Sequence, residues 1–135
     1  MFVTVWLGIL KLSSGVIAAA NAGHVRPAVC QDNLFERIKD KHGMPLGGIN
    51  NSNYKDYTIK LVPGDKVFVY SDGIPEARNN RQEMFQPDRM IDSLNRNRDR
   101  SAEEIVQALK ADIDEFVGDT QQFDDLTMLL FEYKG

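Results

Sequence analysis

The chain has 135 residues, the length of one domain, with 42% hydrophobic and 27% charged residues, which is typical of a soluble globular protein. Its formal net charge of −4 argues against a protein that binds duplex nucleic acid, because such a protein needs a basic face to meet the phosphates. Cys30 is the single cysteine, so an intrachain disulfide is excluded and a reducing, cytoplasmic compartment is expected.

An apolar run at residues 1–10 has to be distinguished from a signal peptide or a membrane span. No positive charge precedes the run and Lys11 interrupts it, which argues against a signal peptide. The run is also about half as long as the roughly 20 residues that cross a membrane. We therefore expect neither secretion nor a membrane partner, and we interpret the run as part of a buried strand.

Apolar and β-branched runs predict the first strands, at residues 2–12, 16–21, 28–31, 54–61 and 66–71. The first two form a hairpin that is apolar on both faces, which predicts a central position in a sheet. A hairpin-like turn is expected at Asp32-Asn33, and the segment 39–53 is expected to be a loop because it holds glycines and a proline.

Two helices and a last strand follow these strands. Pro87 suits the first turn of one helix, and a capping box formed by Ser101 and Glu104 opens the next, which Gly118 closes. Residues 126–133 form the last strand. This order predicts an α+β fold, with the helices gathered on one side of a mainly antiparallel sheet.

Two aspartates flank the last pair of strands. Asp72 ends one apolar strand and Asp124 precedes another, so both carboxylates meet at one rim if these strands are antiparallel neighbours. Oxygen ligands of this kind suit Mg²⁺ or Mn²⁺, and Gly73 lets the backbone turn sharply beside them. Asp-Gly and Asp-Asp are also common turn residues, so the residues alone leave a plain turn open.

His24 follows Gly23 at the end of another apolar run, where its ring could bind a metal. A single histidine in such a place is more often a hydrogen-bonded structural residue. Both interpretations stay open for His24 on the sequence alone.

Six blocks carry a family resemblance over essentially the whole chain: FVTVWLGIL, ANAGHVRPAV, MPLGG, LVPGDKVFVYSDGIPEA, MFQPDRM and FDDLTMLLF. In this order they resemble the SpoIIE/Rsb-type branch of the PPM metal-dependent protein serine/threonine phosphatases. The resemblance implies a layered α-β-β-α sandwich with mainly antiparallel sheets and a two-metal Mn²⁺ or Mg²⁺ centre. It also implies hydrolysis of phosphoserine or phosphothreonine on a protein, with anti-sigma-factor antagonists as the expected substrates.

The resemblance also implies roles for individual residues. Asp72 matches the family's metal-binding aspartate, with Gly73 contributing through its backbone, and Asp124 matches another metal ligand. Asp125 falls where a neighbouring group orients a ligand. His24 matches a place near an accessory metal.

One family motif has no counterpart in this sequence, the upstream Gly-Asp-Phe-Tyr-Asp-like motif whose aspartates complete the metal pair. Residues 1–135 therefore resemble the C-terminal portion of the phosphatase domain, with the N-terminal part missing. We expect weak or absent metal binding, little activity, and a homodimer formed through exposed sheet edges. A non-catalytic module for partner binding or dimerisation is the alternative.

Overall fold

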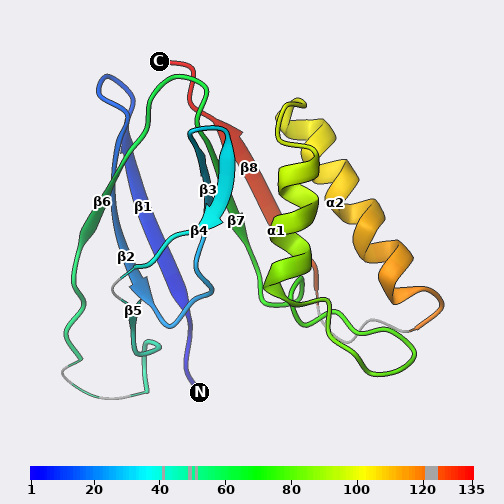
Figure 1. Cartoon of the computed structure of the whole chain (residues 1–135). Helices are drawn as coiled ribbons and strands as arrows, with labels where there is room; N and C mark the ends of the chain where they lie inside the picture. Colours follow the sequence, from blue (N-terminus) through cyan, green and yellow to red (C-terminus); the bar gives the residue numbers. More distant parts are fainter. Residues whose placement is uncertain (41, 49, 51, 121–124) are drawn as a thin grey trace.

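The computed structural model describes residues 1–40, 42–48, 50, 52–120 and 125–135 (Figure 1). One sheet, called here the β1–β2 sheet, contains β1 (Val5–Lys11), β2 (Val16–Ala22), β5 (His42–Gly43) and β6 (Tyr57–Lys60). The other, the β7–β8 sheet, has the order β4 (Leu34–Arg37), β3 (Ala28–Gln31), β7 (Lys66–Tyr70) and β8 (Met128–Glu132). The helices are α1 (Gln86–Arg96) and α2 (Ala102–Val117).

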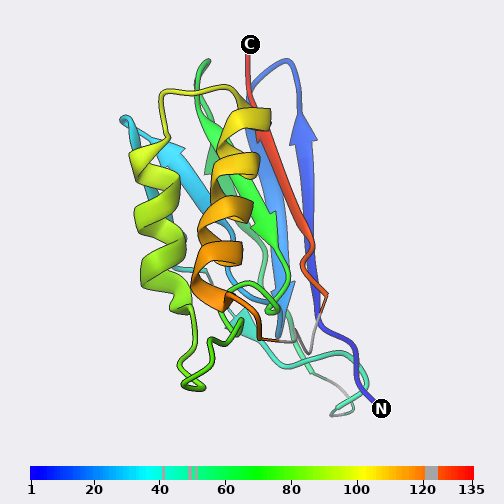
Figure 2. The same ribbon diagram turned by 90° about the vertical axis from the view of Figure 1, so that its right-hand side faces the viewer.

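The elements stack in layers, with α1 and α2 on one face of the β7–β8 sheet and the β1–β2 sheet on its other face (Figures 1 and 2). Strand β7 shows why, because successive side chains of a strand point to opposite faces. Phe68 and Tyr70 pack in the cluster shared with the helices, whereas Val67 packs in the cluster between the sheets. Both faces of β7 are therefore core.

The predicted fold class is confirmed: the chain is a mixed α+β protein whose sheets are mainly antiparallel. The short pairing of β2 with β5 is parallel, and the remaining ladders are antiparallel among the described residues. The described residues supply both sheets and the helical layer on the β7–β8 side.

The predicted local structure is confirmed at several points. The β1–β2 hairpin forms, with Trp6 opposite Asn21. Asp32 and Asn33 both have positive φ, the conformation of a two-residue hairpin turn, and they join β3 to β4. The capping box also forms: Ser101 accepts a hydrogen bond from the amide of Glu104, whose side chain reaches back.

The prediction that the N-terminal strand is buried and central was wrong. Among the described strands β1 pairs with β2 alone and lies at the sheet edge. Its inward residues Trp6 and Leu10 pack between the sheets, but Leu7 and Ile9 point outward and are 59% and 66% exposed. Strand β1 is therefore apolar on both faces, although only its inner face is packed against other residues.

The segment 39–53, predicted as a loop, contains the two-residue strand β5, and the strand expected at residues 54–61 spans only Tyr57–Lys60. In the part of the chain that the structure describes, no helix is both long and apolar enough to cross a membrane.

Candidate metal centre

The rim at the end of β7 brings together the two segments that the sequence analysis singled out. β7 and β8 are antiparallel, with Tyr70 opposite Met128, so the residues after β7 lie beside those before β8. Ser71 joins the two segments: its amide donates to the carbonyl of Thr127 (2.9 Å), and its hydroxyl donates to the carbonyl of Asp125 (3.1 Å). The condition set in the sequence analysis, that these strands are antiparallel neighbours, is therefore fulfilled.

Asp72 lies at this rim, directly after Ser71, and is exposed. Its carbonyl accepts from the amide of Glu76 (3.0 Å), which closes a tight turn over the buried Gly73. Ile74 is fully buried in the core beneath the helices and anchors the turn. The Asp72 carboxylate makes no hydrogen bond or ion pair with other described residues, and its role as a metal ligand stays a prediction.

The other predicted ligands are placed less completely. Asp124 lies outside the described residues. Asp125 is described and exposed, and its carbonyl contact with Ser71 ties the start of the β8 segment to the end of β7. Its proposed role in orienting a ligand stays a prediction.

His24 reaches the same rim from the other sheet. Its Nε2 lies 3.1 Å from the carbonyl oxygen of Tyr70, and its Nδ1 lies 3.2 Å from Oγ1 of Thr4. Because a carbonyl can only accept, Nε2 must carry a proton, and in the neutral ring Nδ1 then accepts from the threonine hydroxyl. With both ring nitrogens engaged, this geometry favours the structural interpretation of His24.

The donor chemistry at the rim suits a hard divalent cation, but the number of donors is incomplete. The Asp72 carboxylate and the Gly73 carbonyl are oxygen donors of the kind that Mg²⁺ and Mn²⁺ prefer. Among the described residues there is no group of three or more histidine, cysteine or acidic side chains that could hold a metal ion. The described residues therefore fit part of a metal site.

A buried polar network behind the rim was missed by the sequence analysis. Asp40 accepts hydrogen bonds from Asn21 and Tyr57, and Tyr57 in turn accepts one from Trp6. Burial raises the pKa of the Tyr57 phenol to about 12. The signal in the sequence was Asn21, a polar residue at an inward position of an apolar strand.

Two hollows lie in this part of the molecule, one beside the rim and one between the helices. One, of about 350 Å³, separates the edges of β1 and β8 next to the rim. It is lined by Trp6, His24, Val69, Tyr70, Ser71, Thr127 and Leu129.

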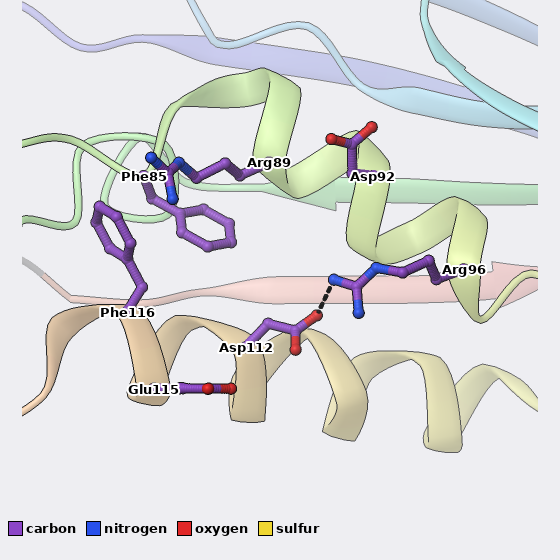
Figure 3. A pocket seen from close by; sticks show the side chains of 7 residues that line it. All are labelled: Phe85, Arg89, Asp92, Arg96, Asp112, Glu115 and Phe116. Carbon is purple, nitrogen blue, oxygen red and sulfur yellow. Dashed lines mark hydrogen bonds and ion pairs between the residues drawn. The ribbon is translucent and has the colours of Figure 1, made fainter.

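The other hollow, of about 520 Å³, lies between α1 and α2 (Figure 3). Arg96 and Asp112 form an ion pair across it (2.8 Å), and Arg89 stacks on Phe116 with its guanidinium 4.6 Å from the ring centre. Asp72 does not line this hollow, so it is separate from the candidate metal centre.

Solved structures with the same fold are phosphatase domains. The Mn-presoaked phosphatase domain of SpoIIE from Bacillus subtilis matches with a TM-score of 0.74 and 18% identity, covering 97% of this chain and 56% of that one. The SiaA-PP2C domain of Pseudomonas aeruginosa matches with a TM-score of 0.75 and 22% identity, covering 89% of this chain and 47% of that one. The fold is therefore that of the PP2C-type phosphatases.

The family model for Stage II sporulation protein E (SpoIIE) matches residues 1–134, and the chain belongs to this family. It is 27% identical to the phosphoserine phosphatase RsbU of Bacillus subtilis strain 168, covering 99% of this chain and 40% of RsbU. It is 28% identical to protein IcfG of Synechocystis sp. strain PCC 6803, covering 96% of this chain and 20% of IcfG. The chain thus spans less than half the length of either relative.

Proposed function

We propose that this chain carries part of a metal-dependent site that hydrolyses phosphoserine or phosphothreonine on a protein. The observation that supports this most is the antiparallel pairing of β7 and β8, which sets Asp72 beside the segment of Asp125. Membership of the SpoIIE family, which includes phosphatase domains, supports the same reaction class.

Within this proposal the metal would be held by Asp72 and by the carbonyl of Gly73, with Asp124 as a further ligand and Asp125 orienting its neighbour. A bound Mn²⁺ or Mg²⁺ pair supplies a water of lowered pKa and neutralises charge on the phosphoryl oxygens. The chain's own contribution is positional: Ser71 and Ile74 fix the turn that presents Asp72. Since the described donors are few, we expect weak or absent metal binding and little activity for this chain alone.

The proposed substrate is a phosphorylated protein. RsbU is described as a phosphoserine phosphatase, which supports a phosphoserine side chain as the target. By resemblance to the Rsb-type branch, we extend this to a phosphorylated anti-sigma-factor antagonist in the cytoplasm.

The proposal is tested by Mn²⁺-dependent hydrolysis of an aryl phosphate by the wild-type chain and by Asp72→Asn. We expect slow, Mn²⁺-dependent hydrolysis that Asp72→Asn abolishes, because the amide cannot supply the anionic ligand. Asp32→Asn is the matched control, since Asp32 is an exposed aspartate in the β3–β4 turn, at the other end of the sheet. Hydrolysis that is equal in wild type and Asp72→Asn would contradict the proposal.

A second candidate function is a non-catalytic module that pairs with a second copy of this chain. It is favoured by the incomplete donor set among the described residues and by the positions of β1 and β8, which each pair with a single described strand at the edge of their sheets. Such edges can pair with another chain. Absence of hydrolysis in every variant, with a mass that rises with concentration in light scattering, would favour this candidate over the enzyme.

A further inference from the structure

Asp40, in the loop between β4 and β5, has a fully buried side chain that the proposed metal chemistry does not use. A carboxylate removed from water is costly unless donors surround it. Three groups donate to it: Asn21 Nδ2 at 2.7 Å, Tyr57 OH at 3.1 Å and Arg26 Nε at 3.1 Å. The carboxylate is thus fixed from several elements at once.

Asn21 connects the Asp40 carboxylate to the backbone of His24. Its amide nitrogen donates one hydrogen to Asp40 and the other to the carbonyl of His24 (3.0 Å), while its amide oxygen accepts from the backbone amide of His24 (2.8 Å). The two acceptors around Nδ2 leave one orientation of the amide group. The side chain of Asn21 therefore sets the path of the backbone through Gly23, whose φ is +74°.

Arg26 ties down the other end of the same segment. Its Nε donates to Asp40, and its carbonyl accepts from the hydroxyl of Tyr70 (2.7 Å). The segment from Asn21 to Arg26 is therefore bound to Asp40 at both ends and to Tyr70 in between.

The peptide group between Tyr70 and Ser71 is hydrogen-bonded on both sides. Its oxygen accepts from Nε2 of His24 (3.1 Å), and its N–H donates to the carbonyl of Thr127 (2.9 Å). Both polar atoms of this peptide group are held, from the two sides of the rim, one residue before Asp72.

We propose that Asp40 is a positioning residue of the candidate metal centre: through Asn21 and Arg26 it holds His24 against the carbonyl of Tyr70 and so fixes the direction in which Asp72 leaves β7. This inference rests on the proposed function for its biological meaning. Its geometry concerns residues of this chain alone, so it can be measured without a metal.

Amide hydrogen exchange of the 135-residue chain, followed by NMR, tests the proposal through the N–H of Ser71. Asp40→Asn keeps the shape of the side chain but turns an NH₂ group toward donors, which breaks part of the network. We expect exchange at Ser71 to become about tenfold faster relative to amides in the middle of β7 and β8.

Asp112→Asn is the matched control. Asp112 also accepts from a hydroxyl and a guanidinium, those of Ser93 and Arg96, but it lies between the helices. This variant should leave the relative exchange at Ser71 unchanged. If Asp40→Asn raises exchange no more at Ser71 than elsewhere in the sheet, the positioning role is overturned.

A second variant, His24→Ala, keeps the test decisive if Asp40→Asn does not fold. It removes the last link to the Tyr70 carbonyl without disturbing the buried carboxylate, and we again expect about tenfold faster relative exchange at Ser71. Unchanged exchange would overturn the proposal. Failure of the phosphatase proposal would show instead as absence of a Mn²⁺ effect on the wild-type chain, with the exchange result intact.

Discussion

The β7–β8 sheet is covered on both faces, whereas the described residues cover the β1–β2 sheet on one face only. In β7, Phe68 is buried beneath the helices and Val67 is buried between the sheets. In β1, Trp6 packs inward while Leu7 is exposed on the outer face. Two strands of similar composition thus differ in how many of their faces are buried. The candidate metal centre lies at the end of β7, the strand that is buried on both faces.

The largest expected effect is at Phe68. It has no exposed surface and stacks on Tyr70 with ring centres 5.3 Å apart. Phe68→Ala leaves a cavity beneath the helices and should lower the free energy of unfolding by about 3–5 kcal/mol. Urea unfolding measures this, and a loss below about 1 kcal/mol would show that the helix-covered face of the β7–β8 sheet is not the main core.

An intermediate effect is expected at Tyr57, between the sheets. In Tyr57→Phe, the Asp40 carboxylate loses a hydrogen-bond donor and the Trp6 N–H loses its acceptor. The free energy of unfolding should therefore fall by about 1–3 kcal/mol at neutral pH.

The same substitution has a pH signature. Because burial raises the pKa of Tyr57 to about 12 in the folded chain from its ordinary value of 10.0, the unfolded chain releases this proton first as pH rises. The stabilisation from Tyr57 is therefore complete below about pH 10 and declines between about pH 10 and 12. In urea unfolding across this range, the difference in free energy of unfolding between wild type and Tyr57→Phe should become smaller as pH rises. A difference that stays constant would contradict a buried, protonated phenol.

The smallest effect is expected at Leu7. Leu7→Thr keeps a strand-forming residue on the exposed outer face of β1, so the free energy of unfolding should change by less than about 0.5 kcal/mol. A destabilisation comparable to that of Phe68→Ala would mean that the outer face of the β1–β2 sheet is covered in solution. Light scattering on the same samples would show whether a second copy covers it.

Patterns that depend on near neighbours in the chain were predictable. The β1–β2 hairpin, the turn at Asp32 and Asn33, and the capping box at Ser101 follow from local periodicity and turn chemistry. The pairing of β7 with β8 entered the sequence analysis only as a condition for a shared rim, and the structure fulfils that condition.

Features that depend on distant partners were not predictable. The sequence around Asp40 resembles an exposed polar loop, and its burial results from donors on β2, β6 and the segment before β3. The edge position of β1 was missed for the same reason, because the sequence of an apolar strand does not show which elements pack against it. The engagement of both ring nitrogens of His24 likewise required Thr4 and Tyr70 to be placed in space.

The most direct test of a metal centre at the end of β7 is the effect of Mn²⁺ on the amide resonances of the isotope-labelled chain. Mn²⁺ is paramagnetic and broadens signals near its binding site. We expect selective broadening of the Gly73 and Asp125 amide signals in the wild-type chain, even with weak binding, and loss of this broadening in Asp72→Asn. Broadening that spares Gly73, or that persists unchanged in Asp72→Asn, would contradict a metal centre at the end of β7.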